Sequence, residues 1–372
     1  MRAFVFTDKA LARYAGQFVW LAVDTENPVN AGFLRKYPIS VWPTMLVVDP
    51  KKEQVALRYA GGATVPQLEK LLGDGARAVR GAGSRADAAL ARGDRLANEG
   101  KHAEAAKAYE EAIAAATKGW SRLGRAAESL SYSLLQSHDY AKCADETLKL
   151  YPRVRGTYSA FNVAANGLSC ASDLEQHGAT FEALEKAARE TLDDPKIPLS
   201  ADDRSGLYET LIGAREAVKD EAGAHTLREQ WAAFLEGEAA KAKTPEQRAV
   251  YDSHRLTVYI DLYQPERAIP MLEQSQRDFP NDYNPPARLG LAWRMMGKYA
   301  MALAAYDRAL AMAYGPRKIT IYQGEVTTYA AKGDKDGARR TLGEAIQYAE
   351  SLPEGQRSER TIASLKKRLE TM

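Results

Sequence analysis

Apolar residues between positions 286 and 316 recur with the three-to-four-residue spacing of an α-helix, and the pattern is interrupted once. The interruption falls at Gly297-Lys298, and Gly315-Pro316 closes the second stretch, because glycine accepts left-handed dihedrals and proline cannot continue a helix. The small residues expected where the two helices touch are Gly290, Ala302 and Ala309. The stretch therefore predicts a helical hairpin with a one-sided core, which needs a neighbour to cover it.

Similar stretches occur elsewhere in the chain. Counted from Ala302, a copy centred on Ala105 carries glycine, lysine, tyrosine and alanine at the same offsets, and weaker copies centre on Ala268 and Ala338. A fixed period of this length is typical of repeat architectures, in which each hairpin covers the apolar face of the next. The repeat-defining residues are Gly93, Gly100, Ala105, Tyr109, Ala112, Gly290, Gly297, Ala302, Tyr306, Ala309, Gly333, Ala338 and Ala345.

This pattern resembles the tetratricopeptide repeat family, which has Leu-Gly in the first helix, Gly-Asp/Lys-Tyr at the turn, and Ala, Tyr/Phe and Ala in the second helix. Leu289-Gly290 and Gly297-Lys298-Tyr299 match it closely, and weaker units extend from about Ala88 to the C-terminus. The resemblance implies an α-solenoid over residues 88–372 that holds a protein or peptide partner in its groove. Some members clamp a carboxylate with Lys and Asn, but the corresponding positions here are Leu90, Asp94, Ala287 and Leu291.

The first eighty residues alternate between strand and helix patterns. The continuous apolar run Phe18–Val23 predicts a strand buried on both faces. The elements expected after it are a short helix over 28–37, strands over 45–48 and 54–59, and a helix opened by a capping box of Thr64 and Gln67. A glycine-rich, charged stretch over 81–87 then predicts a linker to the repeats.

That order of elements, with Tyr37-Pro-Ile-Ser-Val-Trp-Pro-Thr44 leading into a strand, resembles the later part of a thioredoxin-like domain. The resemblance implies an incomplete thioredoxin-like α/β domain over 1–80, followed by the all-α solenoid. It further implies that Pro43 follows a cis peptide bond and that Trp42, Pro43 and Thr44 form a partner-contacting loop. The family's first strand and its Cys-x-x-Cys motif are missing from the chain.

The two cysteines, Cys143 and Cys170, lie 27 residues apart in the helical region, and we expect both to pack in the core rather than to react. The opening stretch from Met1 resembles the sequence that follows Cys-x-x-Cys-x-x in bacterial relatives of thioredoxin. This resemblance implies that the native protein starts upstream of Met1 and carries the two cysteines of that motif there. Two hypotheses follow. The chain is a non-enzymatic adaptor with a redox-inactive thioredoxin-like part, or it is a thiol-disulfide oxidoreductase whose cysteines precede Met1.

Composition and charge exclude several other classes. The net charge of +2 and the short basic clusters without interleaved aromatic residues argue against a nucleic-acid partner. No apolar run is long enough to span a membrane, and no charged start typical of a signal peptide precedes Phe18; the chain as written is expected to be cytoplasmic, or periplasmic with an upstream signal. The five histidines are scattered singly, so the sequence predicts no catalytic residue, no metal site and no cofactor. Oligomeric state is left open.

Overall fold

The computed structural model describes residues 1, 4–81 and 83–372, and the chain divides into two compact units. The first unit contains residues 1–17 and 39–231, and the second contains residues 18–38 and 232–372. The predicted linker 81–87 lies in the first unit, and its residue Ala82 is outside the described residues, as are Arg2 and Ala3. Each unit is described by itself below.

The first unit begins with a small antiparallel sheet. Strand β1 (Thr44–Asp49) pairs with β2 (Gln54–Ala60), with an irregularity in register between Val47 and Val48. Helix α2 (Val65–Val79) follows, and Thr64 and Gln67 form the expected capping box at its start. Both strands and the helix were predicted from the sequence and are confirmed. A short 3-10 helix (Lys9–Tyr14) precedes them in the chain.

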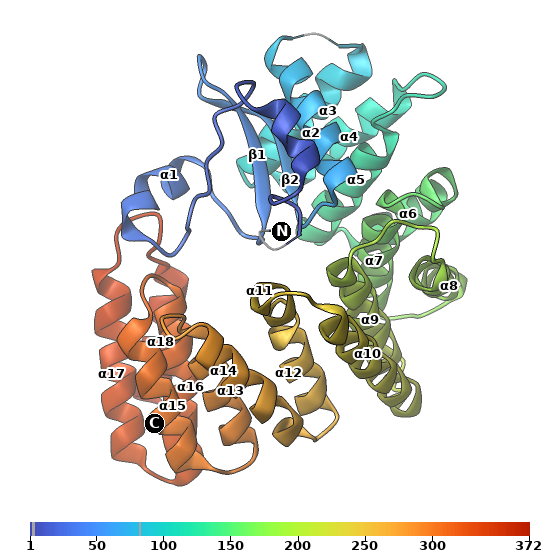
Figure 1. The fold of residues 1–372 in the computed structure, drawn as a ribbon. Helices are drawn as coiled ribbons and strands as arrows, with labels where there is room; N and C mark the ends of the chain where they lie inside the picture. Colours follow the sequence, from blue (N-terminus) through green and yellow to red (C-terminus); the bar gives the residue numbers. More distant parts are fainter. Residues whose placement is uncertain (2–3, 82) are drawn as a thin grey trace. The chain divides into compact units, whose positions relative to one another are not determined.

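Helical hairpins build the rest of the first unit, as predicted (Figure 1). Their helices are α3 (Arg85–Asn98), α4 (His102–Ala114), α5 (Leu123–Gln136), α6 (Tyr140–Val154), α7 (Ser159–Ser172), α8 (Ala179–Asp193) and α9 (Ala201–Ala217). Successive first helices pack on one another, because α5 contacts α7 and α7 contacts α9. They therefore form one continuous face, and β2 lies against α3 on it. Helix α10 (Glu221–Lys241) runs from the first unit into the second.

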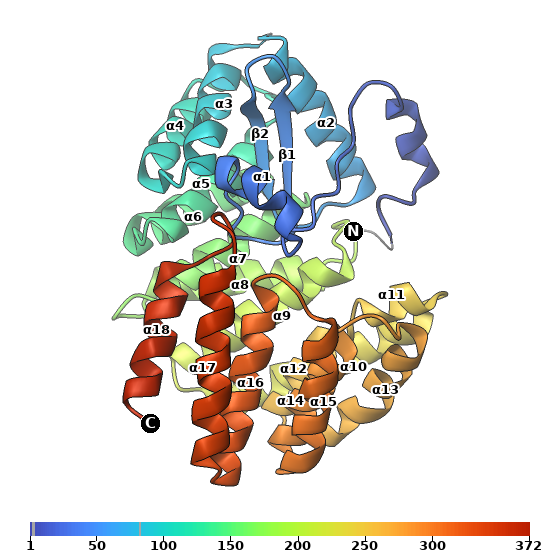
Figure 2. The same cartoon turned by 90° about the vertical axis from the view of Figure 1, so that its left-hand side faces the viewer.

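The second unit contains further hairpins, best followed in the orange and red ribbons of Figure 2. Its helices after α10 are α11 (Pro245–Ala249), α12 (Asp252–Asp261), a 3-10 turn (Pro265–Ala268), α13 (Ile269–Asp278), α14 (Asn284–Met295), α15 (Tyr299–Met312), α16 (Arg317–Lys332), α17 (Lys335–Ser351) and α18 (Glu359–Glu370). The hairpin predicted over 286–316 is the pair α14 and α15. Throughout the described residues, no helix combines the length and apolar character needed to cross a membrane.

Small residues allow the helices of a hairpin to approach closely. A Cβ atom added at Gly93 would lie 2.4 Å from Cε1 of Tyr109, and one added at Gly290 would lie 2.7 Å from the ring of Tyr306. Glycine is required at these two positions because an aromatic ring fills the space of its missing side chain. The alanines at the repeat centres are fully buried, namely Ala105, Ala112, Ala302, Ala309, Ala338 and Ala345. The turn glycines adopt positive φ, at Gly100, Gly297 and Gly333.

Cys143 on α6 and Cys170 on α7 form a disulfide, with Cα atoms 6.0 Å apart. Both side chains are fully buried, which confirms the predicted core position; that the two cysteines are joined to each other was not predicted. The reason is the repeat geometry. The centre of a second helix packs against the following first helix, and the spacing of 27 residues brings the two cysteines face to face across that contact.

Residues 18–38 belong to the second unit, where the predicted strand Phe18–Val23 is absent. The run has no regular structure, and Val19 and Leu21 are 89% and 74% exposed. The prediction is wrong because a strand buried on both faces needs neighbouring strands, and the described residues contain only β1 and β2, which pair with each other. The predicted helix over 28–37 is confirmed as a 3-10 turn (Pro28–Asn30) followed by α1 (Ala31–Lys36).

The segment after the apolar run is held by the C-terminal helices of the second unit. The Tyr314 hydroxyl donates to Asp24 at 2.8 Å, and the backbone amide of Arg317 donates to the Glu26 carboxylate at 2.6 Å. Farther along, Arg35 pairs with Glu354 at 3.0 Å, although both side chains are largely exposed. These polar contacts explain why residues 18–38 group with the last repeats rather than with β1.

Candidate binding site

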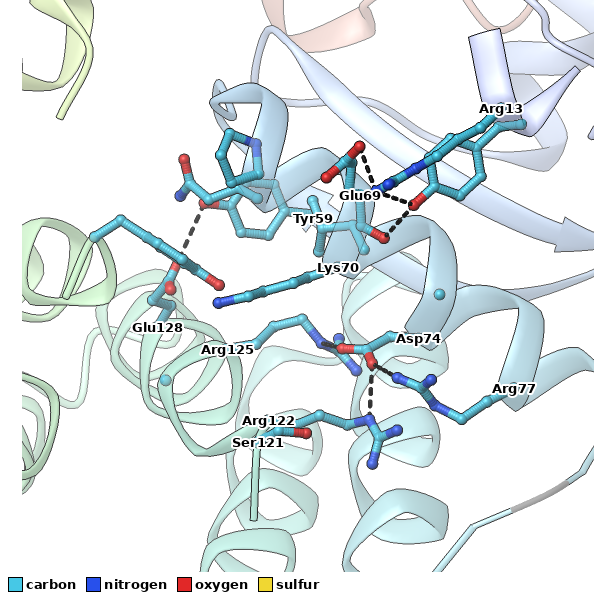
Figure 3. Close-up of a pocket in the computed structure, with 17 residues that line it drawn as sticks. Arg13, Tyr59, Glu69, Lys70, Asp74, Arg77, Ser121, Arg122, Arg125 and Glu128 are labelled. Atoms are coloured by element: carbon cyan, nitrogen blue, oxygen red, sulfur yellow. Dashed lines mark hydrogen bonds and ion pairs between the residues drawn. The ribbon is translucent and has the colours of Figure 1, made fainter. Parts of the chain in front are cut away.

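A pocket of about 460 Å³, lined by several charged side chains, opens in the first unit between α2 and the start of α5 (Figure 3). Helix α2 contributes one wall and α5 with the preceding turn contributes the other. Tyr59 of β2, Tyr158, and Arg13 and Tyr14 of the first 3-10 helix also line the pocket. Because α5 is a first helix of the repeats, the pocket lies at the edge of the face that the first helices form.

The sequence places charged residues on one side of each wall. In α2, Lys70, Asp74 and Arg77 are four and three residues apart, so they share one face of the helix. At the opposite wall, Arg122 precedes the first turn of α5, and Arg125 and Glu128 follow at intervals of three. Two helices with charges at helical spacing therefore face each other across the pocket, as Figure 3 shows.

Asp74 is the centre of the arginine cluster. Its carboxylate accepts from Arg77 and, at 2.9 Å, from Nε of Arg122, and it lies 3.7 Å from Nε of Arg125. Two further carboxylates balance the arginines, because Asp87 pairs with Arg122 at 2.6 Å and Asp94 pairs with Arg125 at 2.7 Å. This network joins α2, α3 and α5 and fixes the direction of the guanidinium groups.

A second network anchors β2 to the first helices of the repeats. Glu128 accepts from the Tyr59 hydroxyl at 3.1 Å, from Asn162 of α7 at 2.8 Å and from Ser159. On α3, Asp94 accepts from the Tyr109 hydroxyl at 2.9 Å and from the backbone of Arg58. Strand β2 is therefore hydrogen-bonded to residues of α3, α5 and α7, so part of the face formed by the first helices is covered by the chain itself.

Burial controls the ionisation of this site. It raises the pKa of the Glu128 carboxyl, although the hydrogen bonds from Ser159, Asn162 and Tyr59 oppose that rise. It also raises the pKa of Asp94, against the attraction of Arg125. For Tyr158, burial and then the nearby Glu128 raise the pKa to about 12, so its hydroxyl keeps its proton at neutral pH and remains a hydrogen-bond donor.

The residues predicted for the partner-contacting loop lie just before and at the start of β1. The Trp42–Pro43 peptide bond is cis, as the resemblance to thioredoxin-like domains implies. Trp42 is 59% exposed, the Thr44 hydroxyl donates to the carbonyl of Val41 at 2.7 Å, and the Pro43 carbonyl accepts from the amide of Gly61 at 2.8 Å. None of the three lines the pocket, so the loop and the pocket are separate surfaces of the first unit.

Sequence reasoning did not identify the pocket residues. The residues of the two walls are about fifty positions apart in the sequence, and the pattern of each wall alone predicts a solvent-exposed helix face. One signal for the pocket was present in the sequence, because the spacing of Lys70, Asp74 and Arg77 places positive and negative charges on the same helix face. No rule of spacing, however, pairs that face with residues 122–128.

The comparisons with known proteins yield only weak similarities. The sequence matches no protein-family model and none of the curated proteins compared with it. Among solved structures, the chain is similar to BtubC from P. vanneervenii (17% identity, TM-score 0.36), over 68% of this chain and 91% of BtubC. It is also similar to a Rap protein complexed with competence and sporulation factor (11% identity, TM-score 0.43), over 82% of this chain and 84% of that protein.

A further similarity is to the TPR2AB domain of yeast Sti1 in its pHSP90 complex (13% identity, TM-score 0.28), over 77% of this chain and 98% of that domain. With TM-scores of 0.43 and below and identities of 17% and below, these likenesses assign neither a family nor a ligand to the chain.

Proposed function

We propose that this chain is a protein-binding adaptor that holds a peptide or protein partner on its tetratricopeptide-like hairpins. The observation that carries the proposal is the continuous face formed by the first helices α5, α7 and α9 of the first unit, with the pocket between α2 and α5 at its edge. Stacked helical repeats expose such extended surfaces, and repeat proteins use them to bind other chains.

The chemistry of the cysteines supports binding rather than redox catalysis. Thiol exchange needs an accessible thiolate, but Cys143 and Cys170 are the two cysteines of this sequence, and both are fully buried in one disulfide. We therefore propose that the segment 1–80 is a thioredoxin-like part without redox activity of its own. Its exposed Trp42, beside Pro43 and Thr44, would serve as a second contact surface for the partner.

Site-specific photo-crosslinking of the full chain tests the proposal. A photoreactive phenylalanine analogue replaces Ser121, which lines the pocket, and a matched variant carries it at Lys107, an exposed residue on the second helix α4. After irradiation in a lysate of the cells that produce the protein, we expect the same discrete adduct from position 121 and from a third variant at position 42. Position 107 should give none. Adducts of equal yield at all three positions, or no adduct at 121 and 42, would contradict the adaptor function.

A further inference from the structure

The pocket between α2 and α5 is lined by more cationic side chains than carboxylates. Each carboxylate in its lining is already engaged, since Glu69 pairs with Arg13 at 2.5 Å, Asp74 with the arginine cluster, and Glu128 with its three donors. A lining whose carboxylates are already paired with cations or donors is complementary to a ligand that brings its own negative charge.

Lys70 is the cation of the lining that has no carboxylate partner within the described part of the chain. Arg13, Arg77, Arg122 and Arg125 each form an ion pair, whereas the contact of Lys70 is with the ring of Tyr158, whose centroid lies 5.1 Å from Nζ. Figure 3 shows its side chain extending across the pocket between Tyr59 and Arg125. Lys70 therefore places an unneutralised positive charge over the space that a ligand would enter.

Other donors surround this charge. The Tyr158 hydroxyl stays protonated and has no hydrogen bond to another described residue. The Nε atoms of Arg77 and Arg125 are buried without an acceptor at hydrogen-bond distance, and Arg125 itself is nine-tenths buried. These two Nε atoms have no accessible surface for a ligand to reach, so Lys70 and the Tyr158 hydroxyl are the donors on which the site depends.

We propose that this pocket binds an oxyanion group, a phosphate or a carboxylate, carried by the protein partner, with Lys70 and the Tyr158 hydroxyl as its principal contacts. The proposal rests on the adaptor function and adds the chemical class that the pocket recognises. Arg77, Arg122 and Arg125 are positioning residues, because the Asp74 network that they form holds α2 and α5 at the separation that the pocket requires.

Small anions test the pocket without knowledge of the partner. The full chain, labelled with ¹³C in its tyrosine rings, is titrated with inorganic phosphate, with acetate, and with chloride at equal ionic strength. Tyr158→Phe assigns the Tyr158 signal. We expect that signal to shift saturably with phosphate or acetate and not with chloride, since a specific contact differs from general screening. If only phosphate saturates the shift, the pocket recognises a phosphoryl group. If phosphate and acetate both saturate it, the pocket recognises carboxylates as well.

Two charge-matched variants locate the effect. Lys70→Met removes the charge but keeps an unbranched side chain over Tyr158, and we expect it to weaken anion binding about tenfold, as loss of a charge-assisted hydrogen bond would. Lys107→Met removes the same charge from an exposed position on α4 and should leave binding unchanged. Equal responses to chloride and phosphate, or unaltered binding in Lys70→Met, would overturn the inference. Crosslinking at position 121 together with no anion response would refute only the oxyanion site and leave the adaptor function standing.

Discussion

A single methyl group decides whether two helices of a repeat can touch. At Gly290 on α14, an added Cβ would lie 2.7 Å from the Tyr306 ring, which is closer than carbon atoms approach without displacement. Tyr306 is almost fully buried, so its ring cannot turn away into solvent. The absence of a side chain at Gly290 is therefore as necessary for this contact as the presence of the Tyr306 ring.

We expect Gly290→Ala to destabilise the second unit by about 1 to 3 kcal/mol, the usual cost of overpacking a core. Gly343→Ala is the matched control. Gly343 also lies inside a helix, α17, but an added Cβ there meets no atom within 4 Å, so alanine should stabilise by up to about 1 kcal/mol through its better helix propensity. Urea unfolding of the two variants measures the difference. Equal effects would show that the Tyr306 contact does not constrain the hairpin.

A buried carboxyl group predicts how stability depends on pH. Burial, followed by the charges of Asp307 and Glu344, raises the pKa of Glu325 from 4.5 to about 7, while Arg340 opposes this rise. The folded state therefore binds more protons than the unfolded state between these values, and the free energy of unfolding falls as pH rises through this range.

Glu325→Gln removes this titration. At pH 8 the variant should be more stable than the wild type, by at most about 3 kcal/mol. At pH 4 the two should converge, because Glu325 of the wild type is then mostly protonated in both the folded and the unfolded state. Thermal unfolding across this pH range is the measurement, with Glu370→Gln, an exposed residue at the end of α18, as the control. A stability difference that does not change with pH would contradict the assigned titration.

At the scale of elements, the sequence predicted structure where an element satisfies its own hydrogen bonds or, as for β1 and β2, pairs with its neighbour in the chain. The hairpin α14 and α15 was placed by helical spacing, glycine at the turn and proline at the end, all of which are local signals. Strand Phe18–Val23 was predicted by the same kind of local signal and does not form, because a strand depends on partners elsewhere in the chain. The pocket could not be predicted for a related reason, since it requires α2 and α5 to meet.

The segment that contains Asp24 to Arg35 depends on one glycine in the second unit. Gly315 has φ of +62°, and an added Cβ would lie 2.1 Å from the carbonyl oxygen of Glu26. Gly315→Ala should therefore release this segment from α16, so that its backbone becomes flexible enough for trypsin to cleave after Arg35. Gly333→Ala shares the positive φ, at +84°, but meets no atom within 4 Å, so it should cost stability without releasing the segment. Unchanged cleavage at Arg35 in the Gly315 variant would show that the segment is held by other contacts.

At the scale of the whole molecule, the repeats extend across both units, and α10 continues from one into the other. Repetition predicted this continuity from the sequence, because each hairpin needs a neighbour. It did not predict that residues 18–38 join the last repeats while 39–80 join the first. That division depends on pairs such as Tyr314 with Asp24, which are 290 positions apart. Contacts between such distant residues produce no periodic pattern in the sequence.

The two units should lose structure separately when each is weakened by a change of its own. Cys143→Ala with Cys170→Ala removes the disulfide of the first unit, which closes a loop of 27 residues and contributes about 3 kcal/mol, whereas Gly290→Ala weakens the second unit. Hydrogen exchange measured by peptide mass spectrometry should show faster exchange over residues 123–193 in the first variant and over 284–351 in the second. If both variants instead lowered protection equally along the whole chain, the repeats would unfold as one cooperative array, which would contradict this prediction.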